Sequence, residues 1–406
     1  MTVNKYLPFA FIYFFINTLG LPLGLTYTAI LSPFFYWWVI TKRKQEIILP
    51  FVGILLLFVI IHFVNGADMR SYFISFFNLL TVYIFCQAVY TFFKIYKEPE
   101  KIYWNLFVVN FILCLIAIPV YFTPYNKILW IQQYLTEGVD NFLRMKLFTY
   151  EASYYATLFT PLFFFFFLQI IFKHNKRSIG LILPMLFLPY LLSFSMGVIS
   201  AVMIAVAISF LFYLKRLTRK RRVRTMISLS VSIAILLVGI MIIFFPDNIL
   251  FLRIENIFTG ADSSGRGRTY EAFILADKLL DEKSQLWGIG LGQIKLLGAE
   301  IIRDFYLYPM DYTVFTIPNA AAETLAIFGW IGFSLRIFIE IALFFYTKVW
   351  TNYYRLLLFL FIFLYQFTGS FITNIAEYVI WILAFTNVFS QYNVLEKNKV
   401  SVPKNS

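Results

Sequence analysis

Long apolar runs, separated by short polar connections, make up most of this chain. A helix needs about 20 apolar residues to cross the hydrocarbon core of a bilayer. By that criterion the sequence predicts twelve membrane-spanning helices, at about 6–22, 24–40, 47–63, 71–93, 102–122, 152–172, 179–194, 196–214, 227–245, 325–347, 354–370 and 376–392. We therefore expect an all-α, polytopic integral membrane protein.

Two longer polar segments interrupt this pattern. Residues 123–151 separate the fifth and sixth predicted spans, and residues 246–324 separate the ninth and tenth. The chain thus divides into nine spans in residues 1–245, one large loop, three spans in residues 325–392 and a tail at 393–406. The large loop has room for structure of its own.

One part of the large loop has helical periodicity. From Thr269 to Glu282 apolar residues recur three or four positions apart, which predicts an amphipathic helix lying on the membrane or across the mouth of the bundle. The glycine-rich sequence WGIGLGQ follows it and predicts a turn.

The composition agrees with a membrane protein. Of the 406 residues, 61% are hydrophobic and 14% are charged, and the mean hydropathy is +0.77. A soluble domain cannot bury that much apolar surface, whereas a helical membrane protein exposes it to lipid.

The charged residues predict an orientation. Basic residues cluster in alternate short connections, including Lys42–Lys44 and the run at 215–224, so the positive-inside rule places both termini in the cytoplasm. The net charge of +13 would also suit nucleic acid. Because the longest basic run lies between two apolar segments, we interpret it as an anchor that touches anionic lipid. Most acidic residues fall on the other side, so the polar working surface is expected outside.

Residues that form disulfides or bind metals are few. Cys86 and Cys114 fall within predicted spans and are interpreted as packing residues. His62 and His174 fall on opposite sides of the membrane, which argues against a histidine metal site. We expect no metal and no cofactor.

The segment 262–293 holds the most distinctive chemistry. Arg266 and Arg268 are two residues apart, so in an extended segment their side chains point the same way, and the intervening glycine allows close approach. Guanidinium groups match phosphate oxygens, and a helix N-terminus after them would add N–H donors. The alternative is that both arginines merely pair with Asp262 or Glu271.

Short motifs in this segment resemble the signature of the O-antigen ligase and polymerase superfamily. The sequence Ser264–Gly265–Arg266 is followed four positions later by an aromatic residue, Tyr270, where the family usually has tryptophan. Further similar motifs are the glycine turn Gly288–Gly292, Asn319 ahead of Gly329 and Gly332, Glu151–Ser153, and Ser193–Ser195. Ligases of the family usually have histidine before that asparagine. Here the residue is Pro318, so the resemblance favours a Wzy-type repeat-unit polymerase over a ligase.

The resemblance implies a membrane-embedded glycosyltransferase of the C-type class in the bacterial plasma membrane, with its active face in the periplasm. The donor would be a growing glycan on undecaprenyl pyrophosphate, and the acceptor a single repeat unit on a second such lipid. The bilayer and a chain-length-regulating co-polymerase would be its other partners. O-antigen and capsule products are equally compatible with it.

Candidate site residues follow from these motifs. Arg266 and then Arg268 would stabilise the departing pyrophosphate, while Arg144 and Lys146 would clamp the other lipid. Glu151 is the candidate base, because partial burial at the membrane boundary would raise its pKa; the alternative is an ion pair with Arg144 or Lys146. Residues assigned to substrate binding through their motifs or their place before the tenth span are Tyr270, Asn319 and Glu323.

Other interpretations stay open. Arg336 and Glu340 lie four residues apart within a predicted span, the spacing of a helical ion pair that neutralises itself. A flippase or transporter of lipid-linked oligosaccharides would also be basic and have twelve spans, although such proteins commonly show two related halves. A non-catalytic assembly subunit would need few converging arginines.

Overall fold

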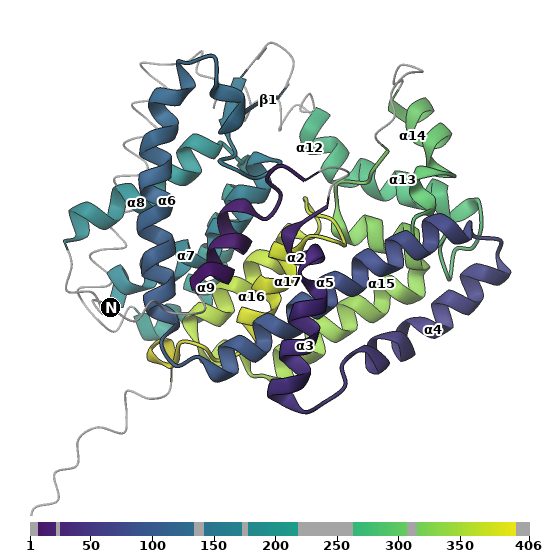
Figure 1. Cartoon of the computed structure of the whole chain (residues 1–406), viewed down its shortest axis with the longest axis horizontal. Coiled ribbons are helices and arrows are strands. Elements are labelled where there is room, and N and C mark those ends of the chain that lie inside the picture. The colour runs from purple at the N-terminus through teal and green to yellow at the C-terminus, as the bar shows by residue number, and fades with distance from the viewer. Residues whose placement is uncertain are drawn as a thin grey trace, which may run out of the picture.

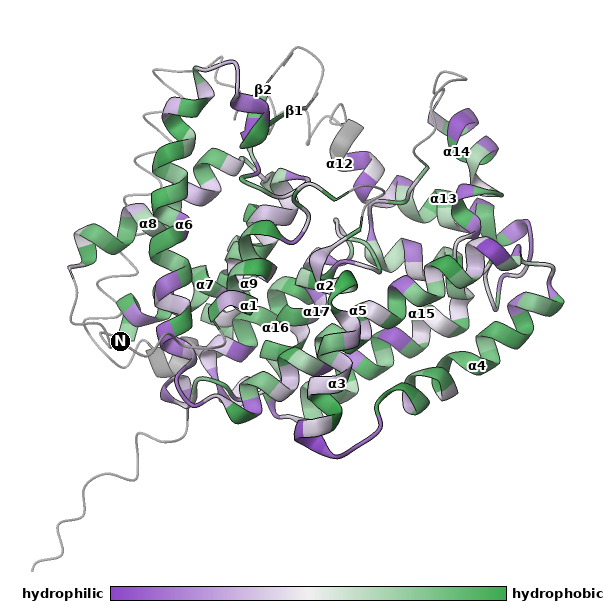
Figure 2. Cartoon of the chain, viewed as in Figure 1, coloured by the Kyte–Doolittle hydropathy of each residue, from purple (hydrophilic) through white to green (hydrophobic). Residues whose placement is uncertain are grey.

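The computed structural model describes residues 7–21, 25–133, 142–172, 178–217, 263–306 and 315–394. Over these ranges the protein is a bundle of helices with one two-stranded hairpin (Figure 1). Polar residues gather at two opposite edges, around β2, α12 and α14 at one and at the turn between α3 and α4 at the other (Figure 2). This is the distribution expected of an all-α, multi-pass membrane protein.

Within the described ranges, five helices are long and apolar enough to cross a membrane. They are α5 (Met69–Ile95), α6 (Pro99–Tyr121), α7 (Ala152–Phe172), α9 (Met196–Leu217) and α15 (Ala320–Tyr346). A sixth span is possible by the same criterion if α3 (Ser32–Arg43) and α4 (Ile48–Val64), which meet at 120°, count as one bent element. The sequence predicted two separate spans there.

The remaining apolar helices are shorter. They are α1 (Leu7–Phe11) with its π-helical continuation η1 (Ile12–Ile16), α8 (Ile179–Ser193), α16 (Tyr353–Tyr365) and α17 (Ile375–Phe385). Each predicted span therefore coincides with helix, except 227–245, which lies outside the described residues. The number of twelve complete spans is not confirmed.

The principal core is aromatic. Phenylalanines of α7, including Phe159 and Phe164–Phe166, are fully buried between α6, α16 and α17. In contrast α4 and α9 keep large apolar side chains such as Leu49 and Leu211 exposed. A soluble protein would bury such faces, so they are surfaces for lipid.

The two polar segments fold onto one edge of the bundle. Between α6 and α7, strands β1 (Trp130–Gln133) and β2 (Phe142–Met145) form an antiparallel hairpin in which Ile131 pairs with Arg144. The large segment contains α12 (Ser263–Arg268), α13 (Tyr270–Asp281) and α14 (Gly298–Tyr306). Short elements elsewhere are α2 (Tyr27–Ile30), η3 (Asn126–Ile128), η4 (Gln293–Lys295), η5 (Val349–Thr351) and η6 (Ser390–Tyr392).

The predicted amphipathic helix is confirmed as α13. Its buried residues are Ala272, Leu275, Ala276, Leu279 and Leu280, and they form a second core with the first half of α15. Tyr270, the first residue of α13, is 54% exposed. The helix therefore packs on the protein, and α15 already begins at Ala320, inside the predicted loop.

A break in α15 receives the glycine turn that follows α13. Gly329 has φ +65° and ψ −170°, so α15 consists of two half-helices. Backbone N–H groups of Ile289 and Gly290 donate to the carbonyls of Ala326 and Ile327, which pairs the turn with the first half-helix. Two glycine motifs that are remote in sequence thus fit against each other.

Candidate functional site

Glu151 and Arg268 form an ion pair at the polar edge. Glu151 directly precedes α7, and Arg268 is the last residue of α12. The Arg268 Nη2 atom lies 2.7 Å from Glu151 Oε1, and both side chains are largely buried. Residues 117 positions apart in sequence therefore meet where the helical bundle opens to the polar edge.

Asn319 holds Arg268 in place through the main chain. The Asn319 Nδ2 atom donates to the carbonyls of Arg268 and Phe367, at 2.8 and 2.7 Å. Its Oδ1 accepts from Ala322 N and caps α15. Because Asn319 is fully buried and makes these three bonds, the geometry favours a positioning role over direct contact with substrate.

Arg266 is the more available arginine. Its side chain is 43% exposed, its Nε atom lies 3.4 Å from Glu271 Oε1, and this atom makes no hydrogen bond within the described residues. The expected extended conformation is wrong, because residues 263–268 are helical. Two residues along a helix differ by about 200° in direction, so the two guanidinium groups do not point the same way.

The hairpin contributes the other two basic residues. Arg144 is buried, and its Nε donates to the carbonyl of Ser193 at 3.0 Å, in the left-handed turn between α8 and α9. Lys146 is half-buried and donates from Nζ to the carbonyl of Thr149. Burial lowers the pKa of Lys146.

Together these residues carry an excess of positive charge. Four cations, Arg144, Lys146, Arg266 and Arg268, accompany two carboxylates, Glu151 and Glu271, at this edge. Since arginine and lysine side chains donate to anionic oxygens, a site with four such cations is suited to an anion with several charged oxygens. We call these six residues the basic cluster.

The structure corrects the expected direction of the pKa shift of Glu151. Burial by itself would raise its pKa, but the charge of Arg268, its hydrogen bond, a hydrogen bond from Ser153 and the charge of Arg144 outweigh burial. The net effect is a lowered pKa, so Glu151 is a weaker base than an ordinary carboxylate. Its ion-pair partner is Arg268, and not Arg144 or Lys146 as the sequence alternative had it.

This pair makes a pH-dependent contribution that can be measured. A carboxylate with a lowered folded-state pKa stabilises the fold above its unfolded pKa, and the contribution is lost as pH falls through the folded-state value. We expect Glu151→Gln to cost about 1–3 kcal/mol at neutral pH, because it removes a charge-assisted hydrogen bond, and to cost nothing in strong acid. Thermal unfolding in detergent at both pH values measures this.

Glu98→Gln is the matched control for that experiment. Glu98 also forms an ion pair, with Lys101, but both side chains are more than half exposed. Such surface pairs contribute little, so its unfolding temperature should stay near that of the unchanged protein. If Glu151→Gln were as stable as the unchanged protein at neutral pH, the claim that the Glu151–Arg268 pair stabilises the fold would be wrong.

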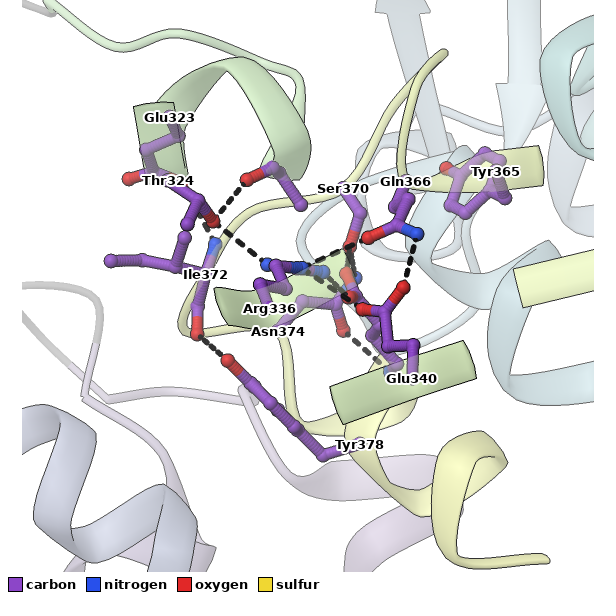
Figure 3. Close-up of polar contacts among 12 residues, drawn as sticks. Glu323, Thr324, Arg336, Glu340, Tyr365, Gln366, Ser370, Ile372, Asn374 and Tyr378 are labelled. Carbon is purple, nitrogen blue, oxygen red and sulfur yellow. Dashed lines mark hydrogen bonds and ion pairs between the residues drawn. The ribbon is translucent and has the colours of Figure 1, made fainter. Parts of the chain in front are cut away.

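Glu323 belongs to a different cluster. Its Oε2 accepts from the backbone N–H of Ile372 at 2.7 Å, in the loop between α16 and α17 (Figure 3). The predicted pair of Arg336 and Glu340 is confirmed, with Arg336 Nε 3.1 Å from Glu340 Oε1. The sequence did not reveal that Glu377 is a second carboxylate partner of Arg336, because it lies 41 residues away on α17.

His62, a possible ligand for a metal ion or carrier of a proton, has both ring nitrogens engaged in contacts within the protein. His62 lies between the carbonyl of Trp287 and the hydroxyl of Tyr72. In the part of the chain that the structure describes, no group of three or more His, Cys, Asp or Glu residues is arranged to hold a metal ion.

The chain matches no protein-family model and no curated protein. The geometry of the basic cluster and the sequence motifs that meet there are the features that indicate a function.

Proposed function

We propose that the protein is a membrane-embedded glycosyltransferase that joins undecaprenyl-pyrophosphate-linked repeat units into O-antigen or a related surface polysaccharide. The observation that carries this proposal is the meeting of four separate motif segments. Glu151 pairs with Arg268, Asn319 bonds to the Arg268 carbonyl, and Arg144 bonds to the carbonyl of Ser193. Motifs that resemble one family's signature thus lie in one place, together with the cationic side chains of the basic cluster.

The cluster fits the charge that such a reaction develops. A hydroxyl oxygen of the acceptor forms a bond to the anomeric carbon of the donor, while the bond from that carbon to pyrophosphate oxygen breaks. The departing undecaprenyl pyrophosphate gains negative charge, and prearranged arginines stabilise it there. It can itself accept the hydroxyl proton, so the step does not need the weakly basic Glu151.

An apolar cavity of about 500 Å³ offers a place for a lipid chain. It is lined from α1, α3, α5, α6 and α7 by residues that include Phe9, Phe35, Phe85, Phe92 and Leu158. Leu158 lies about two helical turns after Glu151, so the cavity begins roughly 10 Å from the basic cluster along α7. In a bound lipid, the pyrophosphate would contact the basic cluster and the attached polyprenyl chain would lie in the apolar cavity.

The surface glycan of a strain lacking this gene tests the proposal. A polymerase predicts that the deletion leaves a single repeat unit on the surface anchor and that the unchanged gene restores a ladder of longer chains. Complete loss of repeat units from the anchor would favour a ligase or a flippase. An unaltered ladder in the deletion strain would contradict all three functions.

A further inference from the structure

A buried polar network surrounds Arg336 and joins four chain segments (Figure 3). Its guanidinium group donates to Glu340 and Gln366 from Nε, to Thr324 from Nη1 at 2.9 Å and to Glu377 from Nη2. The second oxygens of the two carboxylates accept from Gln366 Nε2 and from the hydroxyl of Ser370. Every group named here therefore has a partner, as a buried network requires.

Arg336 bridges the break in α15. It lies in the second half-helix, whereas Thr324 lies in the first, before Gly329. The Thr324 hydroxyl in turn donates to the carbonyl of Ala320. Since the backbone at Gly329 is not helical, this side-chain bond replaces part of the rigidity that an unbroken helix would have.

The same network holds the loop at residues 366–374 against the start of α15. Backbone N–H groups of Ala320 and Ala321 donate to the carbonyls of Gly369 and Gln366, both at 3.1 Å. The side-chain amide of Asn319 donates two further hydrogen bonds. One is to the carbonyl of Phe367 in this loop, and the other is to the carbonyl of Arg268. Loop, half-helix and Arg268 are thus connected by one short chain of hydrogen bonds.

We infer that Arg336 is a positioning residue of the basic cluster. Arg336 fixes Thr324, on the helix that Asn319 caps, and Gln366, in the loop whose carbonyl Asn319 contacts. In this way it sets the place of Arg268 relative to Glu151. This role rests on the proposed function in so far as Arg268 acts on a pyrophosphate. Lysine cannot replace Arg336, because a single ammonium group lacks the planar fork that reaches four partners.

Thr324→Val tests this inference without removing any charge, and Thr324→Ser is its matched control. Valine keeps the shape of threonine but loses the hydroxyl that Arg336 contacts, whereas serine keeps it. With lipid-linked repeat units extracted from the deletion strain, we expect kcat of the valine variant to fall by about 10- to 100-fold, with KM little changed. The serine variant should stay within a few-fold of the unchanged protein. Equal kcat in the two variants would overturn the inference.

A readout that does not depend on glycan synthesis separates this inference from the proposed function. With Cys86 and Cys114 replaced by alanine, Arg266→Cys places one thiol two residues before Arg268, and its maleimide-labelling rate reports the local conformation. We expect Thr324→Val to change this rate and Thr324→Ser to leave it unchanged. An unchanged rate in the valine variant would overturn positioning, even if the protein proved not to be a polymerase.

A neutral triple variant covers the case in which Thr324→Val fails to fold. Arg336→Met, Glu340→Gln and Glu377→Gln together remove all three charges, and buried ion pairs can often be replaced in this way without loss of stability. If the network only neutralises charge, this variant keeps its kcat and labelling rate. Positioning predicts that both change while the protein still inserts and purifies as a single species.

Discussion

Arg266→Ala is expected to lower the rate of glycan polymerisation by about 100- to 1000-fold, which is the usual cost of losing one donor to a developing oxyanion. Arg266 is suited to this test because it is partly exposed and its ion-pair distance to Glu271 is 3.4 Å. Removing it breaks a 3.4 Å contact with Glu271 in which Arg266 Nε makes no hydrogen bond among the described residues, so we expect the protein to fold and insert. Arg268→Ala would break a direct 2.7 Å hydrogen bond and leave Glu151 largely buried without its partner.

Two further variants make the Arg266 result specific. Arg266→Lys should restore little activity, because lysine retains the charge but loses two-point hydrogen bonding to phosphate oxygens. Arg70→Ala is the matched control, since Arg70 is an exposed arginine near the start of α5 and is not a member of the basic cluster. The measurement is the length distribution of surface glycan in the complemented deletion strain at matched expression. A full ladder from Arg266→Ala would contradict the assignment of Arg266 while leaving the polymerase proposal standing.

Gly329→Ala is expected to be strongly destabilising, at a cost of about 3 kcal/mol or more. Its φ and ψ lie in a region that is open almost only to glycine, and such strain alone costs about 1–3 kcal/mol. A Cβ atom would also lie 2.3 Å from the carbonyl oxygen of Leu286 and 2.6 Å from the backbone nitrogen of Gly288. Both neighbours are backbone atoms, so neither can move aside without opening the turn.

Gly53→Ala provides the control for this prediction. Gly53 lies within α4, and an added Cβ there would meet no atom within 4 Å. Alanine favours helix over glycine by about 1 kcal/mol, so this variant should be as stable as the unchanged protein or slightly more so. Thermal unfolding of both variants in detergent decides the matter. If Gly329→Ala unfolded at the temperature of Gly53→Ala, the close contact between the two glycine motifs would not exist.

Local signals in the sequence located most elements. Apolar runs of sufficient length predicted the helices, and the spacing of apolar residues predicted α13 to within one residue at each end. The same signals predicted α8 to within one residue, and they overestimated the length of α16 and α17. Between α16 and α17 the chain forms the buried loop around Gln366 and Ser370. A run of apolar residues shows that a segment is buried in lipid or protein, but it does not show which of the two.

For the candidate site, the sequence identified residues but not their arrangement in space. Arg266 and Arg268 could be selected from their spacing and their glycine neighbours, and Glu151 from its motif. The relative directions of the Arg266 and Arg268 side chains could not be predicted, because residues 263–268 form a six-residue helix and not the expected extended segment. The ion-pair partner of Glu151 could not be predicted from the sequence either. Other basic residues are closer to it in sequence, and only tertiary packing brings Arg268 within 2.7 Å.

Sequence information is sufficient to identify a multi-pass membrane protein, its principal helices and the segments that carry charged motifs. These properties depend on composition and short-range periodicity, which any stretch of chain displays directly. The folded structure is needed to show that Asn319 supports Arg268, that Arg336 bridges a broken helix and that Glu151 forms an ion pair. Those properties depend on contacts between segments remote in sequence, because burial and the nearest charge set the chemistry of an ionisable group.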